Sequence, residues 1–236
     1  MNQAVRFCVI ALLVFVPATA FAGTIVTGDK VKITGSTGTL GGGPFSLDGP
    51  DAGSGTDFLT FCIEIDEHIS YNNLYYAKIA TVAVEGGAGG PNPDPLDSRT
   101  AYLYSNFIKG TLVGYDSSSV DDRNGLQLAI WRIEDEVYRN GGGAYRRSDT
   151  NATMGSTPNW ARADAFYDLA NGIIHPVGEL YGVRVLQLWT DDLTKPGLFN
   201  INRQDQLIYV PEMTSSFSTV LLGVSLLGVA RRRFRP

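Results

Sequence analysis

The order of hydrophobic patterns along the chain constrains its fold most. Strand-like segments come first, helical spacing follows, and strand-like segments return near the end. The strand patterns cover residues 24–34, 58–65, 74–84, 181–190 and 206–210, and the helical patterns cover residues 99–109, 125–138 and 158–170. This order predicts an α+β fold, in which a β-sandwich or barrel-like sheet carries an inserted helical subdomain.

Short polar residues mark where the three predicted helices begin. The candidate N-caps are Asp97 or Ser98, Asp121 or Asp122, and Thr157 followed by Pro158. Glycine- and proline-rich turns are expected up to residue 55 and again over residues 86–95. The acidic run at residues 134–136 is expected on the exposed face of the second helix.

The first 22 residues have the pattern of a secretory signal. Arg6 precedes an apolar run over residues 8–16, and the small-residue site Ala20-Phe21-Ala22 stands before Gly23. The apolar run is about 9 residues long, too short to cross about 30 Å of hydrocarbon as a helix. The sequence therefore predicts export, with a mature chain that starts near Gly23.

The other end of the chain has the pattern of a membrane anchor. Residues 217–230 carry no charge, and the arginines that follow at once are Arg231, Arg232, Arg233 and Arg235. Counted from Thr214, the segment has about 17 residues and would span about 25 Å as a transmembrane helix. The positive-inside rule places the arginines in the cytoplasm, as a membrane stop, and the bulk of the protein outside.

This tail resembles a known sorting signal. Val210-Pro211-Glu212-Met213, a Ser/Thr spacer, a Leu/Gly-rich helix and a terminal arginine cluster are similar to the PEP-CTERM tail of Gram-negative bacteria that make exopolysaccharide. Met213 stands where that family usually has proline. The resemblance implies a sorting signal at Val210, Pro211 and Glu212 in a tail over residues 211–236. It also implies processing by an exosortase-type protease, transient anchoring in the inner membrane, and delivery to the cell surface or extracellular matrix.

Charge and cysteine content describe the ectodomain between these segments. Without Arg6 and the four tail arginines, 14 of the 19 basic residues remain, and without Glu212, 23 of the 24 acidic residues remain, so residues 23–210 have a net charge of −9. Nucleic acid is therefore a poor partner and is not expected, and the length suits one domain. Cys8 leaves with the signal, so Cys62 is the one cysteine of the mature chain. It could be an inert buried thiol, an intermolecular disulfide, a catalytic nucleophile, or bonded to something other than sulfur.

Two short motifs resemble the bacterial surface thioester domain. The first is Phe61-Cys62-Ile63 and the second is Gln127-Leu128-Ala129-Ile130-Trp131, with the helical Tyr102-Leu103-Tyr104 between them in the order typical of that family. Leu126 stands where the family usually has threonine. The resemblance spans roughly residues 58–175. It implies an internal thioester between the Cys62 sulfur and the Gln127 side-chain carbonyl, formed with loss of ammonia.

The chemistry of such a bond explains what it would do. A cysteine thiol has a pKa of about 8.5, so its thiolate leaves far more easily than ammonia leaves an amide. An amine or hydroxyl of a surface or matrix partner can therefore attack the glutamine carbon and form a covalent crosslink. Apolar cover must exclude hydroxide until then, and the candidate shielding residues, which are equally ordinary core residues, are Phe61, Ile63, Ile130 and Trp131. The sequence thus predicts a covalent binding or adhesion module.

Other chemistry is less well supported. A cysteine hydrolase needs a histidine beside Cys62, and the chain has only His68 and His175, so we expect no enzyme and no catalytic residue. A zinc site needs more nitrogen and sulfur ligands than are present. The carboxylates of residues 48–57 and 94–97 are expected in solvated turns, so no metal and no cofactor is expected. The alternative function is a non-covalent structural protein of the exopolysaccharide matrix with an inert Cys62.

Overall fold

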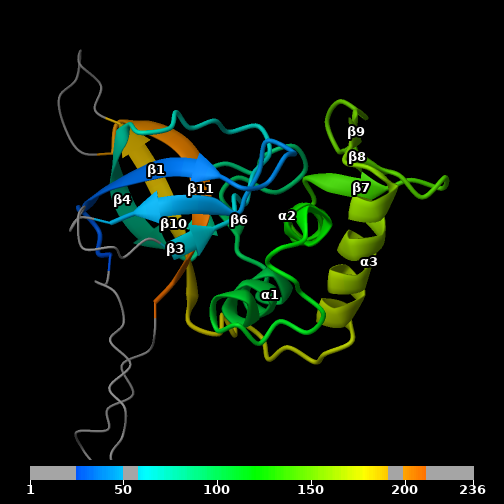
Figure 1. Ribbon diagram of the computed structural model, residues 1–236. Helices are drawn as coiled ribbons and strands as arrows, with labels where there is room; N and C mark the ends of the chain where they lie inside the picture. The colour runs from blue at the N-terminus through cyan, green and yellow to red at the C-terminus, as the bar shows by residue number, and fades with distance from the viewer. Residues whose placement is uncertain (1–24, 50–57, 191–198, 211–236) are drawn as a thin grey trace, which may run out of the picture.

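The computed structural model describes residues 25–49, 58–190 and 199–210. Within them the chain is a mixed α+β protein with three helices and antiparallel sheets, and this part of the fold prediction is confirmed (Figure 1). The predicted signal at residues 1–22 and the tail at residues 211–236, with its transmembrane helix, lie outside the described residues. Of the helices described, none has the length and apolar character to cross a membrane.

Six strands form the main sheet, and all their pairings are antiparallel. The strands are β1 (Lys30–Ser36), β2 (Phe45–Asp48), β3 (Phe58–Thr60), β4 (Leu74–Ala80), β10 (Val183–Thr190) and β11 (Ile201–Tyr209). Their order across the sheet is β11-β10-β4-β1-β2-β3. The strand β2 was not predicted, because its four residues lie within a glycine- and proline-rich stretch that was read as turns.

The two edges of this sheet meet. Beyond β3 the chain continues alongside β11, where the Leu207 N–H donates to the Phe61 carbonyl over 2.9 Å. One residue further on, Cys62 pairs with Gln206 as an antiparallel bridge. The segment of residues 61–63, which carries Cys62, therefore lies along β11, at the other edge of the curled sheet. Its backbone partners are residues 205–207 of β11.

The three helices lie together beside the sheet (Figure 1). They are α1 (Ser98–Ile108), α2 (Val120–Ile133) and α3 (Thr157–Asn171). Two small sheets accompany them: β5 (Val82–Ala83) pairs with β6 (Asp94–Pro95), and β7 (Val137–Arg139), β8 (Tyr145–Arg147) and β9 (Thr153–Met154) form a meander. The helices thus interrupt the main sheet between β4 and β10, as an inserted unit.

Three predicted helix boundaries are wrong: the start of α2, the end of α2 and the cap of α3. The end of α2 is Ile133 and not residue 138, because residues 137–139 form the strand β7. Asp97 caps α1 as predicted, and its carboxylate accepts from the Arg99 N–H over 2.7 Å. The cap of α2 is Ser119, whose hydroxyl accepts from the Asp122 N–H over 3.1 Å, so that helix begins five residues before the predicted start at residue 125. The cap of α3 is Ser156 and not the residue that follows it.

Gly125 is the reason for the misplaced start of α2. It was read as a helix terminus, but it lies inside the helix, at the crossing with α3. A Cβ at this position would lie 2.4 Å from the Cβ of Arg162 and 3.1 Å from the Ala163 nitrogen. The glycine therefore permits a close approach of the two helices. Next to it, Asp122 forms an ion pair with Arg162 over 2.5 Å.

The acidic run after α2 does not lie on an exposed helix face, and that expectation was wrong. Glu134 and Glu136 are buried, 4% and 0% exposed, and only Asp135 between them is exposed. The Glu136 carboxylate accepts from the backbone N–H groups of Ile65, over 2.8 Å, and Ala88, over 2.9 Å. Burial raises the pKa of Glu134 to about 8 and that of Glu136 to about 7. These carboxylates tie the loops of the sheet to the helical unit.

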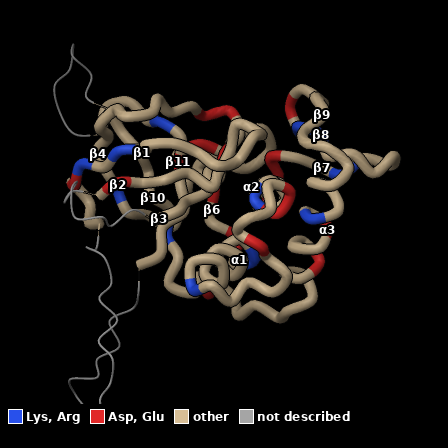
Figure 2. The backbone as a smooth tube through the Cα atoms, viewed as in Figure 1, with Lys and Arg blue, Asp and Glu red and all other residues tan. Residues whose placement is uncertain are grey.

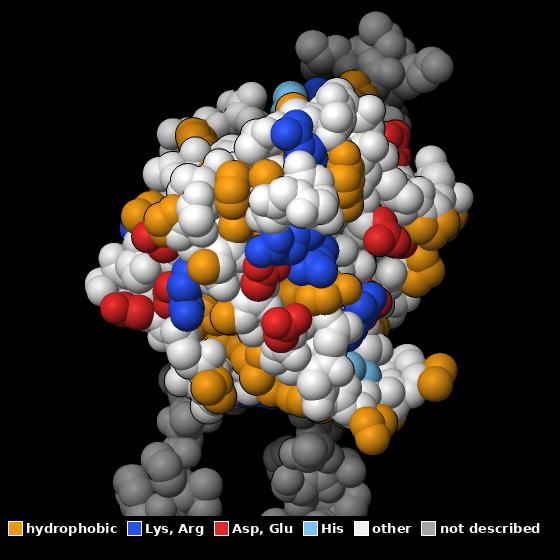
Figure 3. Space-filling view, turned by 90° about the vertical axis from the view of Figure 1, so that its right-hand side faces the viewer, with side chains coloured by type: hydrophobic (Ala, Val, Ile, Leu, Met, Phe, Trp, Pro, Cys, Tyr) orange, Lys and Arg blue, Asp and Glu red, His pale blue; other side chains and the backbone are white. Residues whose placement is uncertain are grey.

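Charged residues of both signs are distributed along the backbone of the sheet and of the helical unit (Figure 2). On the face formed by the helical unit, basic and acidic side chains alternate with apolar ones (Figure 3). Asp164 of α3 pairs there with Arg132, over 3.1 Å, and with Arg139, over 2.6 Å. Such partly exposed pairs contribute about 1 kcal/mol or less each, so the buried core carries most of the stability.

Candidate functional site

The structure brings the two predicted partners together. The Cys62 thiol donates to the Gln127 side-chain oxygen, with 3.4 Å between Sγ and Oε1. Both residues are 0% exposed. Cys62 comes from the segment after β3, and Gln127 comes from the second turn of α2 and not from the predicted helix start. The sheet and the helical unit therefore meet at this pair.

Each polar atom of the Gln127 amide has a defined partner. The Nε2 group donates to the backbone carbonyl of Cys62 over 2.8 Å, and Oε1 accepts from the backbone N–H of Gly43 over 2.7 Å. These bonds fix the orientation of the amide, because a reversed amide would place like groups against each other. The side-chain carbonyl carbon consequently lies beside the Cys62 sulfur, with the Gly43 N–H directed at its oxygen.

The loop between β1 and β2, residues 37–44, covers the pair, and we call it the glycine loop. A Cβ at Gly42 would lie 2.6 Å from the Gln127 Cγ and 2.8 Å from the Trp131 Cη2, and one at Gly43 would lie 2.6 Å from the Thr60 carbonyl oxygen. No other residue type fits so close to the amide. The sequence analysis did not assign a role to these glycines, although the run Gly41-Gly42-Gly43 before Pro44 was a visible signal of close backbone approach.

Hydrogen bonds hold the glycine loop closed over the site. The Ser36 hydroxyl donates to the Gly42 carbonyl over 2.9 Å. The Thr39 N–H donates to the Asn124 side-chain oxygen over 2.9 Å, and the Asn124 amide donates to the Thr39 hydroxyl over 2.8 Å. Asn124 lies one turn before Gln127 on α2. The loop is therefore tied to the same helix that carries the amide.

Burial dominates the electrostatics of the thiol. It raises the pKa of Cys62 well above the ordinary value, because a thiolate is poorly stabilised away from water. The Gly43 N–H and the Trp131 indole N–H act in the opposite direction without cancelling it. The Trp131 Nε1 has no hydrogen-bond partner among the described residues. The sulfur is thus a neutral, buried thiol.

The predicted shielding residues are all buried, but they divide between two parts of the core. Trp131 belongs to the same cluster of core side chains as Cys62. Phe61, Ile63 and Ile130 belong to the neighbouring cluster, on the side of α1. Phe61 and Ile63 alternate with Cys62 along the strand, so their side chains point away from the sulfur. The direct cover of the pair therefore comes from Trp131 and the glycine loop.

Leu126, which stands where the thioester-domain family usually has threonine, is fully buried. Leu126 is 0% exposed and packs in the cluster on the α1 side, away from the cluster that holds Cys62. Its side chain therefore fills core space that a threonine would leave partly empty.

Neither histidine takes part in the site. His175 bonds through its ring nitrogens to the Tyr181 hydroxyl and the Ala170 carbonyl, both over 2.8 Å. His68 is exposed and its Nδ1 lies 2.8 Å from the Glu67 carbonyl oxygen. The hydrogen bonds of the described residues thus give Cys62 no general base of the kind that a cysteine hydrolase uses.

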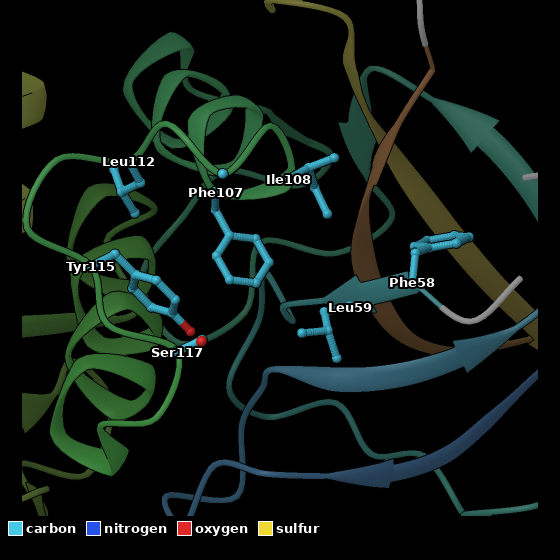
Figure 4. Close-up of a pocket in the computed structure, with 8 residues that line it drawn as sticks. Phe58, Leu59, Phe107, Ile108, Leu112, Tyr115 and Ser117 are labelled. Carbon is cyan, nitrogen blue, oxygen red and sulfur yellow. The ribbon is translucent and has the colours of Figure 1, made fainter. Parts of the chain in front are cut away.

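An apolar hollow of about 520 Å³ lies on the side of residues 61–63 that faces away from the Cys62 sulfur. Figure 4 shows the rings of Phe107 and Tyr115 and the side chain of Leu59 around it. The Phe61 ring packs edge-on against Phe107, with 5.0 Å between centroids. The hollow is therefore separated from the Cys62 sulfur by the strand itself and does not belong to the site.

The predicted sorting signal starts at the last described residue. The Val210 N–H donates to the Gly182 carbonyl over 2.7 Å. Pro211 and Glu212, and the predicted membrane stop at Arg231, Arg232, Arg233 and Arg235, lie outside the described residues.

Comparison of the chain with family models, with curated proteins and with solved structures finds no match in any of the three.

Proposed function

We propose that this chain is an exported surface or extracellular-matrix protein that couples itself covalently to a partner through an internal thioester between Cys62 and Gln127. One observation carries the proposal: the two side chains are buried together, 3.4 Å apart at Sγ and Oε1, and the Gly43 N–H is bonded to that oxygen. A leucine would fill a core position at lower cost than a glutamine. The amide is better explained by chemistry than by packing.

Bond formation needs only these groups. The Cys62 sulfur attacks the side-chain carbonyl carbon of Gln127, a C–S bond forms, and the C–N bond breaks. The thiol proton leaves with the amide nitrogen, so a thiol and a carboxamide become a thioester and ammonia, a loss of about 17 Da. The Gly43 N–H stabilises the negative charge that develops on Oε1 in the tetrahedral intermediate. The 3.4 Å contact joins Sγ to Oε1, the oxygen bonded to the carbon under attack, so the sulfur lies next to the amide that it would attack.

Coupling to a partner reverses the exchange with a different nucleophile. A primary amine or a hydroxyl attacks the same carbon, forms an amide or an ester with the Gln127 side chain, and releases the Cys62 thiol with its proton. Since both residues are 0% exposed, the glycine loop must move before a partner can reach the carbon. In its closed position the loop excludes water, which would otherwise hydrolyse the bond.

Export and anchoring belong to the same proposal and rest on the sequence patterns. The signal at residues 1–22 directs export, and the tail from residue 211 holds the precursor in the inner membrane until an exosortase-type protease processes it. The product is released to the cell surface or the extracellular matrix, where amines and hydroxyls are available as partners. Val210, the first residue of the predicted sorting signal, directly follows β11 and its N–H donates to the Gly182 carbonyl.

Amine labelling tests the proposal. Purified protein treated with methylamine should carry one methylamide at residue 127 and release one thiol at Cys62. Cys62→Ala and Gln127→Ala should each abolish the label, because each removes one half of the bond. Gln187→Ala is the matched control: Gln187 is also a buried glutamine, 3% exposed, but its amide donates to the Val82 carbonyl, so labelling should persist.

The opposite result would support the alternative function. If the native protein takes up no methylamine and has a free Cys62 thiol, with residue 127 still a glutamine, the covalent mechanism is wrong. The chain would then be a non-covalent structural protein of the exopolysaccharide matrix, in which Cys62 is an inert core residue.

A further inference from the structure

Three carboxylates that the proposed chemistry does not use lie close together, where the segment after β3 meets β11. One oxygen each of Glu64, Glu67 and Asp205 lies within 4.8 Å of the other two. Glu64 is 1% and Asp205 is 0% exposed, and Glu67 is partly exposed. Glu64 follows Cys62 by two residues, and Asp205 comes from β11, so two adjacent edges of the sheet supply the cluster.

The buried oxygens of this cluster lack partners. Both carboxylate oxygens of Glu64 and the Oδ1 of Asp205 have no hydrogen-bond partner among the described residues, and the same holds for the neighbouring Asn202 Oδ1. No lysine or arginine of the described chain forms an ion pair with the three carboxylates. Buried acceptors of this kind need a partner such as a proton, a water molecule or a cation.

We propose that Glu64, Glu67 and Asp205 bind a calcium ion. All candidate ligands are oxygens, which suit a hard cation and do not suit zinc. Calcium takes its ligands at about 2.3–2.6 Å, so two ligand oxygens on opposite sides of one ion are about 5 Å apart. The three carboxylate oxygens lie within 4.8 Å of one another, which fits this geometry. No metal was expected from the sequence, because the carboxylates considered as ligands there, at residues 48–57 and 94–97, were expected in solvated turns.

Hydrogen bonds hold two of the three candidate ligands in place, and the cluster has a route of entry. Glu67 accepts from the Asn202 amide and, over 2.8 Å, from the Asp205 N–H, while the other Asp205 oxygen accepts from the Val84 N–H over 2.7 Å. Glu67 and Asn202 also line an open hollow of about 520 Å³. Water in this hollow can complete the coordination sphere, since three carboxylates supply fewer than the 6–8 oxygens that calcium takes.

The ion would join the two edges of the sheet. The Ile63 N–H donates to the Asp205 carbonyl over 3.1 Å, and Cys62 pairs with Gln206 beside it. Because the ion would have ligands on the segment after β3 and on β11, it would link these two segments in addition to their backbone hydrogen bonds. The proposal stands apart from the thioester, because it depends on different side chains and can be tested in a protein without the Cys62 bond.

Thermal unfolding of the full-length protein in calcium-free buffer and with added calcium tests the site. Saturation at 100-fold above Kd should raise Tm by about 5–10 °C. Glu64→Gln should lose this shift, and without calcium its Tm should equal or exceed that of the unmodified protein, because a buried carboxylate without a partner has been removed. Glu85→Gln is the control: Glu85 is exposed and lines the same hollow, and its variant should keep the shift. Calorimetric titration should give one calcium per chain, and Asp205→Asn provides a second variant if Glu64→Gln does not fold.

Three results would overturn the site. The first is no change in Tm and no binding heat up to about 10 mM calcium, well above the range in which extracellular modules bind. The second is a full shift in both Glu64→Gln and Asp205→Asn. The third is an equal loss of the shift in Glu85→Gln, which would assign the effect to diffuse charge around the hollow.

Discussion

Substitution of Gly42 by alanine should disturb the site through packing alone. The new Cβ would lie 2.6 Å from the Gln127 Cγ, 2.9 Å from its Cδ and 2.8 Å from the Trp131 Cη2, all closer than normal contact. Both polar atoms of the Gln127 amide are hydrogen-bonded, so the side chain cannot move aside freely. Overpacking of this kind costs about 1–3 kcal/mol, and about 2–4 °C of Tm per kcal/mol is typical for a domain of this size. Tm should therefore fall by roughly 2–12 °C.

The fraction of protein that carries the thioester should fall with it, because the amide carbon is displaced from the Cys62 sulfur. Intact mass gives that fraction, and thermal unfolding gives Tm. Gly35→Ala is the matched control, since a Cβ there meets no heavy atom within 4 Å and the glycine is not in the left-handed region. If Gly42→Ala forms the thioester as fully as Gly35→Ala and has the same Tm, the close packing of the loop on Gln127 does not position the bond.

Three further predictions follow from other contacts. Asn124→Ala removes two hydrogen bonds to Thr39, worth about 1 kcal/mol each, and should speed methylamine-induced thiol release roughly thirtyfold. Thr34→Ala, which lies outside the loop, should not change the rate, and equal rates in the two variants would exclude the loop as the barrier. Glu134 has a folded pKa of about 8, raised by burial from 4.5, so the unfolded chain releases its proton first and stability falls as pH rises between these values. Glu134→Gln should therefore gain stability over the unmodified protein from pH 5 to pH 8 in denaturant titrations, and a pH-independent difference would contradict this. Removal of residues 217–236 should convert a membrane-associated precursor into a released protein, and a full-length precursor that fractionates as soluble when processing is blocked would refute the anchor.

Periodicity predicted the fold class well and the boundaries less well. The change from strand to helix pattern identified all three helices, and Asp97 identified the start of α1. The start of α2 was misplaced because Gly125 looked like a terminus, and only the packing of Arg162 from α3 explains a glycine inside the helix. Glu134 and Glu136 were expected in water because a charge run usually is, but tertiary contacts to distant backbone N–H groups hold them inside.

The site was predictable in part. Cys62 and Gln127 were paired through a resemblance and through the count of cysteines, and the structure places them in contact. The Gly43 donor was not predicted, because the neighbours of a backbone N–H depend on how the loop folds over α2. The carboxylates of Glu64 and Asp205 are 141 residues apart in the sequence and meet only through the pairing of two sheet edges. No local pattern carries that information.

The intact mass of the untreated protein tests the central claim most directly. The thioester account predicts a mass about 17 Da below that of the mature sequence, one ammonia, with the deficit mapped to a peptide pair that contains Cys62 and Gln127. The deficit should vanish in Cys62→Ala. A native protein with the full mass, a free thiol at Cys62 and an unchanged glutamine at residue 127 would contradict the account.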